Sequence, residues 1–128
     1  MKVSIFSFGY KFSGVPNDNS GNFGGYVFDC RVLDNPYHNP KIKDFDGRSK
    51  EIKQFFEGDI NSEKFIENCY NLIELSVVKY KKRGFTNLFV AFGCTGGFHR
   101  SVYCSEKVTE MLKDKGYEVE LKHCELDN

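Results

Sequence analysis

Residues 93 to 101, Gly-Cys-Thr-Gly-Gly-Phe-His-Arg-Ser, concentrate groups that can donate hydrogen bonds to an anion. Adjacent glycines let backbone N–H groups turn inward, and a helix that begins beside them adds unpaired donors and partial positive charge. Arg100 can clamp an anion with two donors, and His99 offers a donor or a charge that varies near neutral pH. The pattern predicts a phosphate site, and its structural alternative is a tight strand-to-helix turn with an N-cap. The candidate ligand-binding residues of this loop are Cys94, Thr95, Gly96, Gly97, His99, Arg100 and Ser101.

The same loop fits the Cys-x5-Arg-Ser/Thr pattern of cysteine-dependent phosphatases, with Cys94 as the nucleophile and Arg100 as the clamp for the transition state. A cysteine at a helix amino end beside cationic side chains lies in a setting that favours the thiolate. Two features oppose this interpretation. Gly93 stands where these enzymes usually have His, and no separate loop offers an obvious acid for the leaving group, although Asp29 or Asp34 could reach it if their strand end lies adjacent. Catalysis is therefore the second hypothesis, and a binding module without catalytic residues is the first.

A second group of polar residues lies at the end of the predicted second strand. Asp29 and Arg31 are two positions apart, so their side chains point to the same side of a strand, and Asn35 and Tyr37 follow shortly after. An Asp–Arg pair of this kind is as often a structural ion pair as part of a binding site. Lys11, just past the first strand, is a further candidate.

These strand ends would form one site if the sheet brings them together. Lys11, Arg31 and Arg100 would then surround a phosphate, while Asp29 and Asn35 would bind hydroxyl or amino groups. A sugar phosphate satisfies this mixture, and a bare phosphate or sulfate anion would use the same donors. The sequence therefore predicts a phosphorylated small molecule as the ligand.

The elements that must position these residues alternate between strands and helices. Alternating or continuous apolar residues predict strands at 3–8, 26–33, 88–92 and 117–121. Helical spacing predicts helices near 50–57, from a cap at Asn61 or Ser62 to the basic run before Gly84, and from 101 to about 115. This order indicates one α/β domain over residues 1–128, with a mainly parallel sheet flanked by helices and the phosphate-binding loop between a central strand and a helix. Ligands of such folds bind outside the carboxyl ends of the strands.

Composition and charge narrow the classes of function. Eighteen basic residues balance eighteen acidic ones, so the chain lacks the positive field of a strong nucleic-acid binder. The sequence contains neither a leader nor an apolar run of bilayer length, so we expect a cytoplasmic protein without membrane contact. The five cysteines form no C-x-x-C pair, and His38 and His123 have no acid or cysteine at ligand spacing. We therefore expect no disulfide framework, no metal site and no cofactor.

Three motifs together resemble the C-terminal domain of the RapZ family of RNase adapter proteins. They are Ser-Phe-Gly-Tyr-Lys at 7–11, Val-Phe-Asp-Cys-Arg-Val-Leu-Asp-Asn-Pro-Tyr at 27–37 and the glycine loop extended to Val102, in the family's order. The resemblance covers nearly the whole chain. It implies a domain that senses an amino-sugar phosphate, glucosamine-6-phosphate, and that in enterobacterial members also binds a small RNA and presents it for RNase E cleavage. Carried over by motif, the pocket would use Lys11, Asn35, Tyr37, Thr95, Gly96 and Arg100, with Asp29, Arg31, Cys94 and His99 close by.

The sequence departs from full-length family members in three respects. It has no G-x-x-x-x-G-K-[ST] motif, so the P-loop of the family's nucleotide-binding domain is absent, and ATP or GTP binding of that type is not implied. RNA-binding members end in a basic tail, whereas this sequence ends in Glu-Leu-Asp-Asn, which weakens the case for RNA. The loop at 17–25 is longer and richer in glycine, so the pocket rim and the ligand can differ.

An RNA-binding adapter is the third hypothesis. It would rely on Lys41, Lys43, Arg48 and the basic run at 79–83. This hypothesis predicts that affinity for RNA falls steeply as salt is added. By analogy with the family, the chain could also form a homo-oligomer or act with a separate partner protein.

Overall fold

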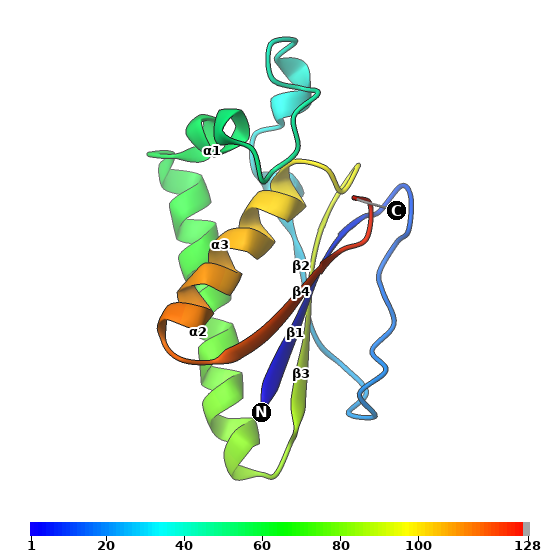
Figure 1. The fold of residues 1–128 in the computed structure, drawn as a ribbon, viewed down its shortest axis with the longest axis vertical. Helices are drawn as coiled ribbons and strands as arrows, with labels where there is room; N and C mark the ends of the chain where they lie inside the picture. The colour runs from blue at the N-terminus through cyan, green and yellow to red at the C-terminus, as the bar shows by residue number, and fades with distance from the viewer. Residues whose placement is uncertain (127–128) are drawn as a thin grey trace.

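The computed structural model describes residues 1–126 of the 128-residue chain and contains a sheet of four parallel strands. The strands are β1 (Lys2–Gly9), β2 (Gly25–Asp29), β3 (Asn87–Cys94) and β4 (Glu118–His123). Their order across the sheet is β2-β3-β1-β4, so β3 and β1 are the central pair (Figure 1). The predicted α/β class with a parallel sheet is confirmed.

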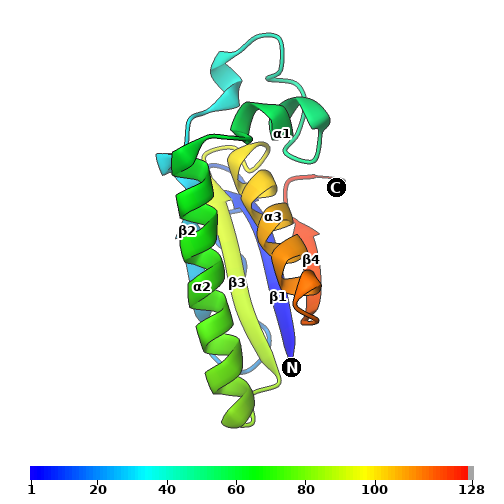
Figure 2. The ribbon, with the colours of Figure 1, turned by 90° about the vertical axis from the view of Figure 1, so that its left-hand side faces the viewer.

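Helices cover one face of this sheet, and a long connection covers part of the other. The helices are α1 (Lys50–Phe56), α2 (Ile60–Lys82) and α3 (Arg100–Asp114). Figures 1 and 2 show α2 and α3 on one face and the segment that joins β1 to β2 on the opposite face. Successive strand residues point to opposite faces, so Val3 and Ile5 of β1 pack with the helices, whereas Phe8 packs with Phe89 on the other side. The apolar run of β3 is accordingly buried on both faces, as its composition predicts.

The long helix α2 begins earlier than the sequence suggested. Its cap is Asp59, whose carboxylate Oδ2 accepts hydrogen bonds from the Ser62 backbone N–H at 3.0 Å and from the Ser62 hydroxyl at 2.6 Å. The prediction of a cap at Asn61 or Ser62 was wrong, because Asp59 is also a strong capping residue and lies directly after the turn at Gly58.

The strand β2 is shorter than predicted, because its polar end folds into turns. The strand stops at Asp29, where the carboxylate accepts a hydrogen bond from the Arg31 backbone N–H and starts a single 3₁₀ turn, Cys30–Val32. A second 3₁₀ turn, Pro36–His38, follows. The predicted strand at 26–33 is therefore corrected to Gly25–Asp29, and Arg31 lies outside the sheet.

Candidate functional site

The carboxyl ends of the two central strands lie side by side, and the segments that follow them stay together. Gly9 of β1 pairs with Cys94 of β3. Beyond the strands, the Tyr10 N–H donates to the Cys94 carbonyl at 2.9 Å, and the Lys11 N–H donates to the Thr95 carbonyl at 3.1 Å. A Cβ at position 9 would lie 2.6 Å from the Gly96 backbone, so only glycine permits this approach. Lys11 is thereby fixed beside the glycine loop, residues 93–101.

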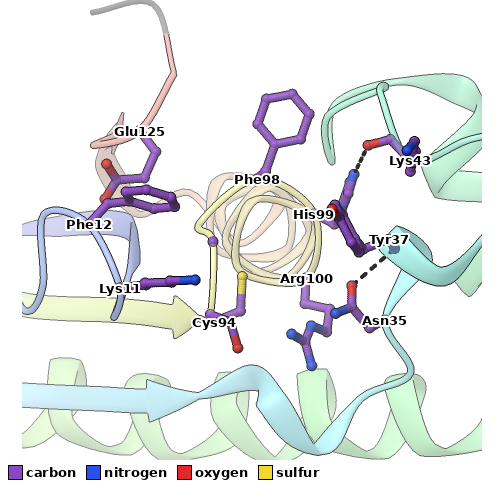
Figure 3. A pocket seen from close by; sticks show the side chains of 12 residues that line it. Lys11, Phe12, Asn35, Tyr37, Lys43, Cys94, Phe98, His99, Arg100 and Glu125 are labelled. Carbon is purple, nitrogen blue, oxygen red and sulfur yellow. Dashed lines mark hydrogen bonds between the residues drawn. The ribbon is translucent and has the colours of Figure 1, made fainter.

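A pocket of about 650 Å³ opens at this edge of the sheet (Figure 3). Its lining residues are Lys11, Phe12, Asn35, Tyr37, Lys43, Cys94, Thr95, Gly96, Phe98, His99, Arg100 and Glu125. Eight of these twelve residues are among those that the sequence selected. The predicted residues that the structure leaves outside the lining are Asp29, Arg31, Gly97 and Ser101.

Arg100 is the first residue of α3 and the most buried cation of the pocket, with 6% of its surface exposed. Its Nη1 donates to the carbonyl oxygens of Arg31 at 3.1 Å and Leu33 at 3.2 Å. Its Nε is buried and has no hydrogen-bond partner, and no carboxylate among residues 1–126 forms an ion pair with Arg100. The protein thus compensates this buried cation in part, through two carbonyl oxygens, and a bound anion would compensate it further.

Asp29 and Arg31 form an ion pair with each other beside the pocket. The Arg31 Nη2 lies 2.6 Å from the Asp29 carboxylate, and their side chains are 51% and 45% exposed. Hydrogen bonds from Arg31 hold the pKa of Asp29 below its ordinary value. The Arg31 guanidinium also lies over the Tyr10 ring, 4.4 Å from its centre. This arrangement favours the structural ion pair over the ligand-binding alternative.

Asn35 and Tyr37 reach the pocket from the turns that follow β2. The side-chain Oδ1 of Asn35 accepts a hydrogen bond from the Tyr37 backbone N–H at 3.1 Å and so caps the Pro36–His38 turn. Because Oδ1 is used in this way, the Nδ2 group is the part of Asn35 that can donate to a ligand. Tyr37 is 62% exposed and lines the pocket.

His99 supplies less to an anion than its residue type suggests. Its Nε2 lies 2.7 Å from the Lys43 carbonyl oxygen, which can only accept, so Nε2 carries the proton. Burial lowers the pKa of His99 below its ordinary value of 6.5, which favours the neutral ring at neutral pH. In the neutral ring Nε2 is then the only protonated nitrogen, and the Lys43 carbonyl accepts its hydrogen bond. His99 therefore ties the Lys43 segment to the glycine loop, and its ring N–H is already used within the protein.

Cys94 and Ser101 contact each other beneath the pocket. The sulfur of Cys94 lies 3.2 Å from the Ser101 hydroxyl oxygen and 3.5 Å from the Ser101 backbone nitrogen, which donates to it. Ser101 is fully buried, whereas Cys94 is 2% exposed and lies on the pocket floor, as Figure 3 shows. The Ser101 backbone N–H thus donates to the sulfur, while the Ser101 hydroxyl oxygen accepts from the Cys94 thiol.

The chain matches a known protein family over nearly its whole length. The family model of the RapZ C-terminal domain covers residues 1–127. The chain belongs to the RapZ C-terminal domain family. It is 35% identical over 127 residues to a nucleotide-binding protein of Thermotoga neapolitana, with 99% of this chain and 43% of that protein aligned. Nucleotide-binding proteins of Clostridium novyi and Pseudothermotoga lettingae are 37% and 39% identical, with 98% and 90% of this chain and 40% and 39% of those proteins aligned.

This RapZ-type domain therefore spans about two fifths of the length of the relatives that it matches. Among residues 1–126, no helix is long and apolar enough to cross a membrane. The same residues contain no group of three or more His, Cys, Asp or Glu side chains that could hold a metal ion.

Sequence reasoning missed four residues of the RapZ-type pocket, namely Phe12, Lys43, Phe98 and Glu125. Phe12 and Phe98 are immediate neighbours of predicted residues, and their exposed rings are 68% and 36% accessible, so adjacency alone could have suggested them. Lys43 and Glu125 lie far along the chain from the glycine loop. Only the folded arrangement brings them to the pocket.

Proposed function

We propose that this domain is a binding module for a phosphorylated small metabolite, whose phosphoryl group is held by the glycine loop. The observation that carries the proposal is Arg100, a cation with 6% exposure whose buried Nε has no partner among the described residues. A guanidinium binds phosphate oxygens through planar, charge-assisted hydrogen bonds. A phosphate bound beside this guanidinium would supply the anionic partner that residues 1–126 do not provide.

The charge of the pocket supports an anionic ligand. Three cationic side chains line it, Lys11, Lys43 and Arg100, against one carboxylate, Glu125. Figure 3 shows Lys11 directed toward the centre of the site beside Cys94. The amino end of α3 adds the partial positive charge of a helix amino terminus.

The size and the rim of the pocket support a ligand larger than phosphate. Small-molecule pockets typically enclose roughly 300–1,000 Å³, and this one encloses about 650 Å³. Asn35 and Tyr37 offer hydrogen bonds to hydroxyl or amino groups, and Phe12 offers an exposed ring for an apolar face. These groups fit a sugar phosphate, and the resemblance to the RapZ family makes an amino-sugar phosphate such as glucosamine-6-phosphate our first choice.

The nucleotide binding that the names of the relatives state does not extend to this domain in our proposal. This chain spans about two fifths of those proteins, and its sequence lacks the P-loop motif that would bind ATP or GTP. We propose instead that ligand binding in the cytoplasm is read out by a second molecule, either RNA, another copy of the domain or a separate partner protein.

The RNA alternative has the weakest structural support. The loop that carries Lys41, Lys43 and Arg48 lies at one end of the molecule, and the basic run at the end of α2 lies at the other (Figure 1). Arg48 is paired with Asp46 at 2.8 Å. The two basic segments therefore do not form one continuous basic surface.

A phosphatase remains the second candidate because of one observation, the contact between Cys94 and Ser101 next to Arg100. In that reaction the thiolate would attack phosphorus, the P–O ester bond would break, the leaving oxygen would take a proton, and water would then cleave the P–S bond. The proton donor is the weak point. The one carboxylate in the lining, Glu125, already accepts three hydrogen bonds from the protein.

Calorimetric titration of glucosamine-6-phosphate, other sugar phosphates and inorganic phosphate tests the binding module. We expect binding to wild type that Arg100→Ala abolishes and Arg100→Lys weakens, because lysine keeps the charge but not the planar donors. Arg83→Ala, which removes an arginine at the end of α2, is the matched control and should bind normally. Absence of binding to wild type, or full binding by Arg100→Ala, would overturn the proposal.

The same samples separate binding from catalysis. Release of inorganic phosphate from p-nitrophenyl phosphate or a sugar phosphate, lost in Cys94→Ser, would establish the phosphatase. We expect no phosphate release from wild type, and we expect Cys94→Ser to retain ligand binding.

A further inference from the structure

The turn that carries Lys11 and Phe12 into the pocket is held mainly by hydrogen bonds. Within the turn, the N–H groups of Phe12 and Gly14 both donate to the Gly9 carbonyl, at 3.0 and 2.9 Å. Neither side chain at its tip is packed in the core, and Phe12 is 68% exposed. The position of Lys11 therefore depends on what anchors the two ends of this turn.

Glu125, from the segment after β4, anchors both ends. Its Oε2 accepts hydrogen bonds from the Gly9 N–H at 2.9 Å and the Ser13 N–H at 3.1 Å, and its Oε1 accepts from the Ser13 hydroxyl at 2.8 Å. All three donors belong to the turn that carries Lys11. A single carboxylate thus closes the turn from outside.

The register of the sheet explains why a side chain takes this role. The pairing of β4 with β1 ends at Ser7 and His123, and the Cys124 N–H then donates to the Ser7 carbonyl at 2.8 Å. The Gly9 N–H lies one step beyond this pairing, and the carboxylate of Glu125 accepts its hydrogen bond. Glu125 therefore extends the sheet contact as far as the pocket.

The segment that carries Glu125 is itself fixed to two elements. The two ring nitrogens of His123 lie 2.6 Å from the Ser7 hydroxyl on β1 and 2.9 Å from the Glu106 carboxylate on α3. Glu125 also packs on the glycine loop, because a Cβ at Gly97 would lie 2.5 Å from its Cγ. The carboxylate is thus held against both loops that form the proposed phosphate site.

A carboxylate is unexpected in the lining of an anion site, because its negative charge repels an anionic ligand. We propose that Glu125 is a positioning residue, which holds the Gly9–Ser13 turn so that Lys11 can meet the anion. This inference rests on the proposed function. The two roles of the carboxylate, repulsion of the ligand and positioning of Lys11, predict opposite effects when it is removed.

Titration of inorganic phosphate and glucosamine-6-phosphate into Glu125→Gln and Glu125→Ala distinguishes these roles. If positioning dominates, affinity falls by roughly tenfold or more in Glu125→Ala, because three charge-assisted hydrogen bonds that fix the turn are lost. Glu125→Gln keeps one acceptor oxygen and should lie between Glu125→Ala and wild type. Glu118→Gln, the same charge change at the start of β4, should bind as wild type does.

A double-mutant cycle with Lys11→Ala separates positioning from a general loss of stability. If Glu125 acts through Lys11, its replacement has little further effect on affinity once Lys11 is alanine. Amide hydrogen exchange at Gly9 and Ser13 should also become faster in both Glu125 variants while the central strand β3 stays protected.

The outcomes distinguish this inference from the proposed function. If Arg100→Ala leaves affinity unchanged, the anion site itself is wrong. If Arg100→Ala abolishes binding but Glu125→Gln and Glu125→Ala bind as tightly as wild type or more tightly, the anion site stands and the positioning role is overturned. Additive effects of the Lys11 and Glu125 replacements would also overturn it.

Discussion

Gly97→Ala should destabilise the domain strongly, whereas Gly96→Ala should not, although the two glycines are adjacent in the loop. Gly97 has φ +72°, which favours glycine, and a Cβ there would lie 2.4 Å from the Gly9 nitrogen and 2.5 Å from the Glu125 Cγ. At Gly96 a Cβ would meet nothing within 4 Å. The same change therefore tests two different environments.

The magnitude for Gly97 follows from two terms. A left-handed conformation costs a non-glycine residue roughly 1–2 kcal/mol, and overpacking at a close backbone contact costs roughly 1–3 kcal/mol. The expected loss is thus about 2–5 kcal/mol, a large part of a typical domain stability of roughly 5–15 kcal/mol. At about 4 °C per kcal/mol, the melting temperature should fall by roughly 8–20 °C.

Urea denaturation followed by circular dichroism measures the stability of both variants, and titration with inorganic phosphate measures their affinity. Gly96→Ala should change the free energy of unfolding by less than about 0.5 kcal/mol, yet weaken phosphate binding, because its methyl group enters the pocket lining. Equal stability of the two variants, or a larger loss in Gly96→Ala, would refute the assignment of Gly97 to the fold and Gly96 to the ligand.

Three further predictions concern charges and caps. Burial lowers the pKa of His99 below 6.5, so the unfolded chain binds a proton at His99 more readily than the folded chain does. Stability should therefore fall as the pH drops below 6.5. In thermal melts between pH 5 and 7.5, the melting temperature of His99→Gln should fall less than that of wild type. Asp59→Ala removes both hydrogen bonds to Ser62 and should cost about 1 kcal/mol in urea denaturation. Asp29→Asn weakens a half-exposed pair with Arg31, so it should cost less than about 1 kcal/mol and leave phosphate affinity unchanged in the same titration.

Features set by short-range pattern were predictable from the sequence. The apolar run of β3 indicated a strand buried on both faces, and the strand, glycine loop and helix that follow lie where the pattern placed them. Pattern failed where several residues could play the same part. Asp59, Asn61 and Ser62 are all good caps within four positions, and the local sequence does not choose among them.

Features set by contacts between distant residues were not predictable. The Glu125 side chain accepts from Gly9, 116 positions away, and the Lys43 carbonyl meets His99, 56 positions away. The end of β2 is an intermediate case, since Asp29 was chosen for its charge but acts as the cap of a turn. The residue type shows that a side chain can donate or accept a hydrogen bond, but its partner depends on the folded structure.

This distinction explains why Arg100 matters more to the proposed function than the number of donors in its loop. Counted by residue type, His99, Ser101 and Arg100 are all donors to an anion. In the folded domain the His99 Nε2 donates to the Lys43 carbonyl, the Ser101 N–H donates to the Cys94 sulfur, and the Ser101 hydroxyl accepts from the Cys94 thiol. Arg100 donates to two carbonyl oxygens through Nη1 and keeps a buried Nε without a partner. The proposed anion site therefore rests on this buried guanidinium, which has no carboxylate partner among residues 1–126, more than on the number of donor residue types in the loop.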